Sequence, residues 1–186
     1  MKTNILFSLR SVSEKIGQSK LLTFVSCLAL SWLYAICSQI IIPLPFNLVP
    51  ISLQPLPLLL AALLLGRYAV VSYGLYLAQG AAGLPFFAGM QGGMLRLLGP
   101  TGGYLMGFGV AMLFLAAVRS YKPASGMLTF AKVLCAAIIY FSMGLAQLAW
   151  FVPADKLLAS GLFPFIIGDA LKLLIVTFIV QCINKK

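Results

Sequence analysis

The chain has 186 residues, of which 62% are apolar and only 9% are charged, and its formal net charge is +10. Polar residues this scarce cannot cover the surface of a water-soluble domain, so lipid must be the solvent for most of the chain. The sequence contains no histidine and only three acidic residues, which excludes histidine-dependent catalytic triads and histidine-rich metal sites.

Apolar runs along the chain predict transmembrane helices. A helix needs about 20 mainly apolar residues to cross a bilayer, so about six crossings with short loops use the whole chain. We therefore expect one all-α membrane domain over residues 1–186 with six transmembrane helices. The predicted spans are Leu21–Ile42, Leu53–Leu65, Tyr68–Gln79, Gly102–Val118, Leu128–Trp150 and Pro164–Cys182.

The basic residues predict the orientation of these spans. Residues 1–20 precede an apolar run that is longer than the core of a signal peptide and lacks a small-residue cleavage site, so we expect a retained helix after a cytoplasmic segment. With both termini inside, only Arg96 and Lys156 lie outside. The cytoplasmic side then holds ten basic residues: Lys2, Arg10, Lys15, Lys20, Arg67, Arg119, Lys122, Lys132, Lys185 and Lys186. This asymmetry is typical of membrane topology and requires no nucleic-acid partner.

Small residues recur at every fourth position in two spans. The first span has Cys27, Ser31 and Ala35, and a second stripe of Gly99, Gly103, Gly107 and Ala111 begins just before the fourth span and continues into it. Such stripes let helix backbones approach closely in lipid. We expect internal packing, with contact to a partner protein as the alternative for one stripe. The cysteines show no metal-binding or redox spacing, so we interpret them as packing residues.

The entry to the second span is rich in proline. Because proline removes a backbone donor and disfavours helix before it, a broken and partly extended segment is expected there, buried in protein or lining a cavity. Gln54 lies in this segment. Its amide either binds a ligand or satisfies the broken backbone.

The segment from Gly80 to Pro100 combines glycine with aromatic residues and is predicted to lie outside, between helices three and four. It is too apolar for a solvated linker, so we expect a re-entrant segment or a lid. A floppy loop would leave Leu84, Phe86 and Phe87 in water at about 1.5–3 kcal/mol each. Arg96 either clamps a carboxylate with two hydrogen bonds or anchors the chain at lipid headgroups.

The last span contains Asp169 and Lys172. Each costs about 2.5–3.5 kcal/mol near the centre of a membrane helix, so the pair must face protein or water. Three residues apart, the two side chains meet on adjacent turns and neutralise one another. A helix that starts at Pro164 places them about 8 and 12 Å below its outer end, at the floor of an outward-facing pocket. The pair either binds a ligand or only locks the last helix to its neighbours.

Enzyme functions find little support in this sequence. The GPTGG run at Gly99–Gly103 has no lysine after it, so it is not a phosphate-binding loop and no intrinsic ATP site is expected. An intramembrane aspartyl protease needs two carboxylates that share a proton, and only Asp169 is a buried candidate. We expect no enzymatic activity, no metal and no cofactor. A purely structural membrane protein is the competing interpretation.

Four motifs follow one another in the chain: VPISLQ at Val49–Gln54, AAGLPFFAG at Ala81–Gly89, GPTGGYLMGF at Gly99–Phe108 and PFIIGDALK at Pro164–Lys172. In this order they resemble the BioY family, the biotin-binding S components of energy-coupling-factor (ECF) vitamin transporters. The resemblance covers nearly the whole chain. It implies a six-helix subunit in the plasma membrane of a prokaryote that captures biotin from outside.

The resemblance also implies a set of substrate-binding residues. They are Asp169, Lys172, Gln54 and Arg96, together with Gly83, Leu84 and Phe87 in and beside the GLP loop. It leaves open which polar group meets the ureido ring of biotin and which meets the carboxylate. Uptake of another small vitamin is the alternative within the same class.

A transmembrane coupling protein and two ATPases are the partners that the resemblance implies. In the family, the first helix often presents an Ala-x-x-x-Ala surface to the coupling protein. The corresponding residues here are Cys27, Ser31 and Ala35, which keep the spacing but not the residue types. We predict partner docking at these positions, with operation without the coupling protein, as a homo-oligomer, as the alternative.

Overall fold

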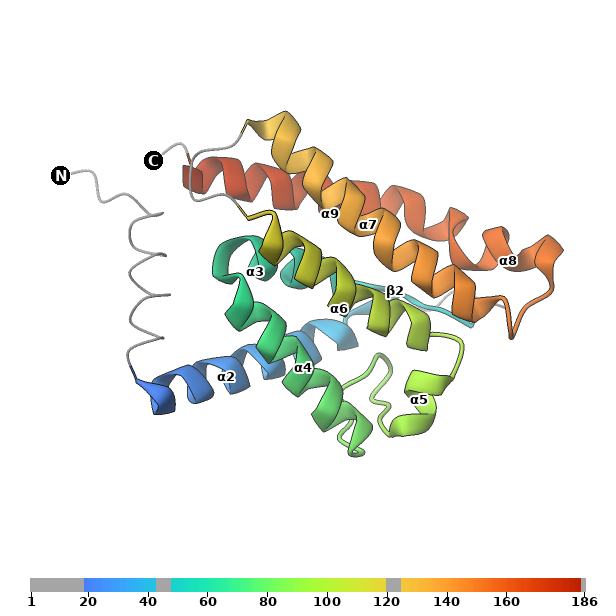
Figure 1. The fold of residues 1–186 in the computed structure, drawn as a ribbon. Coiled ribbons are helices and arrows are strands. Elements are labelled where there is room, and N and C mark those ends of the chain that lie inside the picture. Colours follow the sequence, from blue (N-terminus) through green and yellow to red (C-terminus); the bar gives the residue numbers. More distant parts are fainter. Residues whose placement is uncertain (1–18, 43–47, 120–124, 185–186) are drawn as a thin grey trace.

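The structure is a computed structural model that describes residues 19–42, 48–119 and 125–184, and this part of the chain is mostly helical (Figure 1). The helices are α2 (Lys20–Gln39), α3 (Pro55–Leu65), α4 (Arg67–Ala81), α5 (Met94–Leu98), α6 (Gly102–Ala117), α7 (Gly126–Leu148), α8 (Ala154–Gly161) and α9 (Phe163–Asn184). Two short strands, β1 (Ile41–Ile42) and β2 (Ile51–Ser52), pair antiparallel. The predicted cytoplasmic segment lies outside the described residues except for its last two.

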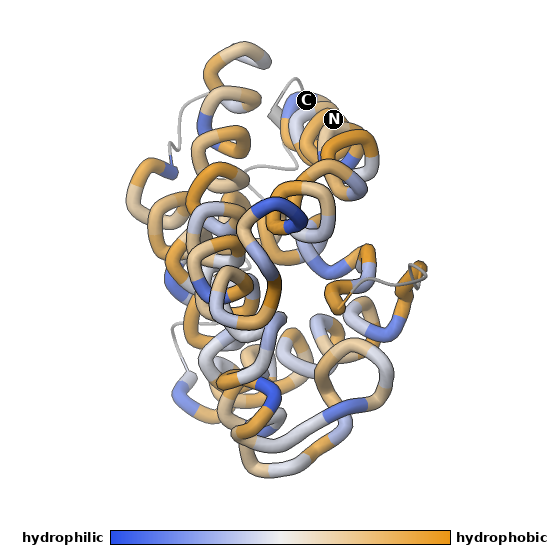
Figure 2. Tube along the Cα trace, turned by 90° about the vertical axis from the view of Figure 1, so that its right-hand side faces the viewer, coloured by the Kyte–Doolittle hydropathy of each residue, from blue (hydrophilic) through white to orange (hydrophobic). Residues whose placement is uncertain are grey.

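Within the described residues, three stretches are long and apolar enough to cross a membrane: α2, α7 and the 30-residue stretch Ala154–Ile183, which contains α8 and most of α9. Helices α3 and α6 are apolar but shorter. Each of the six predicted spans coincides largely with one of the described helices. Hydrophobic residues predominate along these helices (Figure 2).

Helix boundaries follow local chemistry. Serine side chains cap α2 and α7, because the hydroxyl of Ser19 accepts from the Leu22 amide and that of Ser125 from the Leu128 amide. The break between α3 and α4 falls at Gly66, whose φ of +58° favours glycine.

The first predicted span ends too late. Helix α2 stops at Gln39 because the chain becomes extended, and Ile41 pairs with Ser52 while Ile42 pairs with Ile51. The extended entry expected before the second span is present in this ladder.

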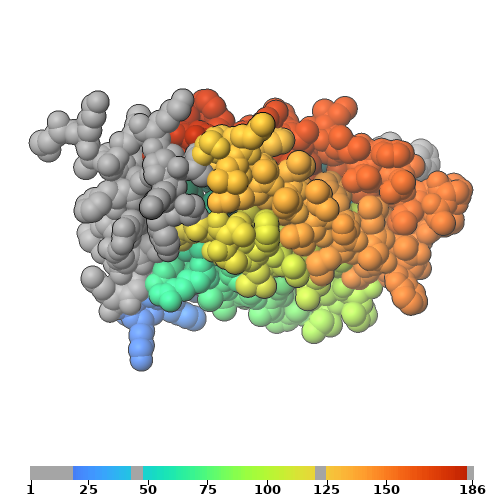
Figure 3. Space-filling view, turned by 45° about the horizontal axis from the view of Figure 1, so that its top comes forward, coloured from blue at the N-terminus to red at the C-terminus, as the bar shows by residue number. Residues whose placement is uncertain are grey.

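Close backbone contact joins α6 to α7, which lie side by side in Figure 3. A Cβ atom on Gly103 would collide with the Met143 carbonyl, and one on Gly107 would lie 2.8 Å from the Tyr140 Cα. In α7, Gly144 leaves room for the ring of Tyr104. The small-residue stripe of α6 therefore serves internal packing, as expected.

The small-residue stripe of α2 also faces the interior. Cys27, Ser31 and Ala35 are all buried, and α2 packs against α4. The Cys27 thiol lies 3.7 Å from the Tyr68 carbonyl, and the Ser31 hydroxyl accepts a hydrogen bond of 3.0 Å from Gln79 Nε2. In this structure α4 packs against the stripe, and docking of a partner protein at these residues stays a prediction.

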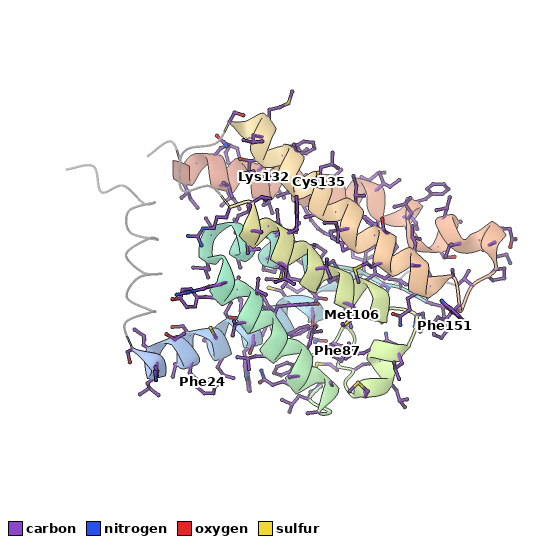
Figure 4. The ribbon with its side chains drawn as sticks, viewed as in Figure 1. Phe24, Phe87, Met106, Lys132, Cys135 and Phe151 are labelled. Atoms are coloured by element: carbon purple, nitrogen blue, oxygen red, sulfur yellow. The ribbon has the colours of Figure 1, made fainter. Side chains whose placement is uncertain are left out.

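The exposed face of α2 carries large apolar side chains. Phe24, labelled in Figure 4, is one of them, and Trp32 and Ile36 are others. Such side chains suit contact with lipid.

A short helix between α7 and α9 has no counterpart among the predicted spans. Helix α8 is only eight residues long and ends at Gly161, whose carbonyl accepts a hydrogen bond of 2.7 Å from the Tyr104 hydroxyl. This bond ties the end of α8 to the first turn of α6.

Candidate functional site

Asp169 and Lys172 form a buried ion pair on α9. Lys172 Nζ lies 2.5 Å from Asp169 Oδ1, and the two side chains are only 10% and 7% exposed for Lys172 and Asp169 respectively. The Tyr140 hydroxyl of α7 donates to Asp169 Oδ2 at 2.7 Å. The contact between the two charges is as the three-residue spacing predicted, whereas the tyrosine partner was not foreseen.

The pair still has hydrogen-bonding capacity. An ammonium group has three donors, of which Asp169 takes one, and a carboxylate has about four acceptor positions, of which Lys172 and Tyr140 use two. A ligand that carries both donors and acceptors can therefore bind without breaking the pair.

Both charged residues line a pocket of about 570 Å³, counting the space at its open mouth. Segments far apart in the sequence contribute to its wall: Val49, Pro50, Ser52, Gln54 and Pro55; Ala88, Arg96 and Thr101; Tyr104, Leu105 and Phe108; Tyr140 and Phe141; and Phe165, Asp169 and Lys172.

Aromatic rings make up much of the apolar wall. The Phe108 and Tyr140 rings have centroids 4.8 Å apart, and Tyr140 and Phe141 are equally close. Tyr104 lies 6.3 Å from Phe141 and 6.4 Å from Phe165. A few polar groups set among packed rings are typical of a site for an amphipathic ligand.

Gln54 contributes an amide to the pocket at the start of α3. The side chain is buried, and its Nε2 donates to the Tyr76 hydroxyl at 3.1 Å. Within the part of the chain that the structure describes, its Oε1 accepts no hydrogen bond. The structure thus places Gln54 in the same pocket as Asp169 and Lys172.

Arg96 reaches the pocket from α5, in the α4–α6 loop (residues 82–101). Partial burial lowers the pKa of its guanidinium from the ordinary value, and the group remains charged at neutral pH. Among the described residues, this guanidinium has no hydrogen-bond or ion-pair partner. The neighbouring carbonyls of Leu97 and Gly99 both accept from Gln147 Nε2 of α7.

The other three predicted ligand contacts do not line the pocket. Phe87 is buried, but its ring packs against Tyr76 and over Gly80 of α4. Leu84 is 42% exposed, and Gly83 forms a turn with φ of +109°. From this part of the loop, Ala88 is the residue that reaches the pocket wall.

A clamp at the end of α2 holds this part of the loop. Gln39 Nε2 lies 3.1–3.3 Å from the carbonyl oxygens of Pro85, Phe86 and Phe87, which its two N–H donors share, and its Oε1 accepts from the Met90 amide at 2.8 Å. Sequence reasoning missed Gln39. The available signal was a polar side chain closing an otherwise apolar helix.

Comparisons with known proteins identify similar chains. A family model described as the BioY family matches residues 10–186. A probable biotin transporter BioY of Methanothermobacter thermautotrophicus is 37% identical over 143 residues, which cover 68% of this chain and 88% of the relative. The biotin transporter BioY of Thermotoga maritima is 33% identical over 146 residues, or 77% of this chain and 86% of the relative.

A solved structure has a similar fold. It is the crystal structure of the S-component for biotin from an ECF-type ABC transporter, with a TM-score of 0.76 and 28% sequence identity. The match covers 90% of this chain and 93% of the other.

Proposed function

Because the chain belongs to the BioY family, we propose that it is the biotin-binding membrane subunit, or S component, of an ECF-type transporter. The observation that carries this proposal is the buried pair of Asp169 and Lys172 in the wall of a mainly aromatic pocket. Burying two charged side chains there costs free energy, and the binding of a ligand by these charges would explain their presence. The relatives are named as transporters, which places the family outside the enzymes.

The chemistry of biotin fits this pocket. Its ureido ring offers two N–H donors and a carbonyl, its thioether ring is apolar, and its tail ends in a carboxylate. Asp169 and Gln54 supply acceptors, Lys172 and Arg96 supply cations, and the rings supply an apolar wall. Direct contact with Gly83, Leu84 and Phe87 would require the α4–α6 loop to move.

We propose six crossings with both termini in the cytoplasm, in the plasma membrane of a prokaryote. The start of α7, with Lys132, lies at the same end of the bundle as the α3–α4 turn and the C-terminal end of α9, and α5 and α8 lie at the opposite end (Figures 1 and 4). This polarity agrees with the distribution of basic residues and favours a pocket that opens outward. Helix α3 spans only about 16 Å, so the extended segment before it would complete its crossing.

Energy for transport would come from a coupling protein with two ATPases. The support is the solved relative, which is described as the S-component of an ECF-type ABC transporter. Operation without that module, as an oligomer of this chain, is the alternative. Uptake of radiolabelled biotin by cells expressing the chain alone, and with a coupling module, distinguishes these two modes.

Calorimetric titration of the purified protein with biotin tests the proposed function. We expect binding at micromolar or tighter affinity, and thermal stabilisation by biotin that is lost in Lys172→Ala. Lys156→Ala is the matched control, because it removes the same charge from exposed α8, outside the pocket wall. Absence of biotin binding by the wild type would contradict the proposal, and competition by thiamine or riboflavin would indicate a different vitamin.

A further inference from the structure

The GPTGG motif is not a phosphate-binding loop, yet its glycines are tightly packed around one side chain. A Cβ atom on Gly102 would lie 2.7 Å from Gln147 Nε2 and collide with the Leu97 carbonyl. One on Gly103 would lie 2.7 Å from the Gln147 Cβ. Since real Cβ atoms do not approach other atoms so closely, these positions need glycine for Gln147 to stay where it is.

Gln147 in turn holds the backbone on both sides of Leu98, which lies two residues after Arg96. Its Nε2 donates to the Leu97 carbonyl at 3.0 Å and to the Gly99 carbonyl at 2.7 Å. These two carbonyls lie at the C-terminal end of α5, a helix of only five residues that begins without a side-chain cap. Helix α5 is too short to be stable by itself, so its position depends on such tertiary bonds.

Helix α7 therefore anchors both polar ends of the pocket. Tyr140 fixes Asp169, and Gln147 fixes the segment that carries Arg96. Tyr140 and Gln147 are seven residues apart, so they lie on the same face of α7, two turns or about 10.5 Å apart along its axis. A helix does not stretch, which makes the spacing between the two anchors constant.

We propose that Gln147 is a positioning residue that determines which length of ligand the pocket accepts. It holds the guanidinium of Arg96, which has no partner among the described residues, at a constant distance from the Asp169–Lys172 pair. A ligand with a polar ring at one end and a carboxylate at the other then binds best when its chain spans that distance. This inference rests on the proposed function, since biotin has both ends.

The test compares biotin with two homologues whose side chains are one methylene shorter and one longer. In the wild type, biotin should bind at least about tenfold more tightly than either homologue, the effect of misplacing one charge-assisted hydrogen bond. Gln147→Ala should weaken the binding of biotin by about tenfold and bring the affinities of the three ligands close together. Gly102→Ala, which displaces the same contacts, should shift the ratios in the same direction.

Two controls separate positioning from general damage. Gln79→Ala removes another glutamine that joins two helices, through Ser31, but lies away from the pocket wall. It should leave the affinity ratios unchanged. In an Arg96→Gln background, Gln147→Ala should have no further effect on biotin affinity, because the group it positions is already gone.

The outcomes are distinguishable. If the wild type does not bind biotin, the proposed function fails. If the wild type binds biotin but Gln147→Ala weakens all three ligands equally, or adds its full effect to Arg96→Gln, Gln147 is only structural and the inference is overturned. A folded Gln147→Ala protein with wild-type affinity ratios would overturn it as well.

Discussion

Replacing Lys172 with methionine separates the stability of the buried pair from its role in binding. Methionine keeps much of the length and volume of lysine but removes the charge. At 2.5 Å, the attraction between Lys172 and Asp169 is about 7 kcal/mol for an effective dielectric constant of 20. Much of this offsets desolvation, and removing one partner of a buried pair costs about 3–5 kcal/mol because the other charge is left uncompensated. We expect Lys172→Met to lower the free energy of unfolding by an amount in this range.

The double variant Asp169→Asn/Lys172→Met gives the comparison. It removes both charges, and the asparagine carbonyl can still accept from Tyr140, so most of the lost stability should return. Unfolding in detergent micelles, followed by circular dichroism, measures stability, and calorimetry measures biotin binding. The double variant should be folded and fail to bind biotin. A loss below about 1 kcal/mol in Lys172→Met would refute the energetic reasoning, and a double variant that binds biotin normally would refute the role of the pair in the site.

Three further substitutions test the loop and the pocket. Gly80→Ala should destabilise the protein by about 1–3 kcal/mol, because its Cβ would overlap the Phe87 ring, whereas Gly74→Ala in the same helix meets open space and should be neutral or stabilising in the same unfolding assay. Gln39→Ala should speed hydrogen exchange of the backbone amides in the α4–α6 loop, because its clamp on that loop is lost. Arg96→Gln should weaken biotin by about tenfold or more and change the binding of biotinamide, which lacks the carboxylate, much less.

Each of these has a clear contrary result. Equal destabilisation by the two glycine variants would show that the Phe87 contact is not the cause. Gln91→Ala is the control for the clamp, because its exposed side chain lies in the same loop. Exchange that rises equally in both glutamine variants would argue against the clamp. Unchanged biotin affinity in Arg96→Gln would favour a headgroup anchor.

The helices were predictable because lipid imposes a strong pattern on the sequence. Apolar runs located all six predicted spans on helices, and errors were confined to ends such as Ile42, where pairing with Ile51 extends the chain. Helix α8 was not predicted because it has only eight residues, between Pro153 and Gly161. A segment this short gives too little hydrophobic periodicity to indicate a helix.

The site was predictable only where the relevant partners are close in sequence. Asp169 and Lys172 are three residues apart on one helix, so their contact follows from helix geometry. Tyr140 lies 29 residues from Asp169, and Gln147 lies 48 residues from Gly99. Those contacts depend on how α7 is rotated about its axis relative to its neighbours. Because α7 is apolar on most sides, the periodicity of its sequence does not determine that rotation.

The glycine-mediated contact between α6 and α7 has a mechanical consequence. Where Gly103 and Gly107 bring backbone against backbone, no rotamer change can open space, so this pair of helices forms a rigid wall. Any expansion that admits or releases a ligand must then come from parts of the pocket wall outside α6 and α7, among them the segment around Gln54. The extended segment before α3 is such a part, because it is neither helical nor packed backbone to backbone against the α6–α7 wall.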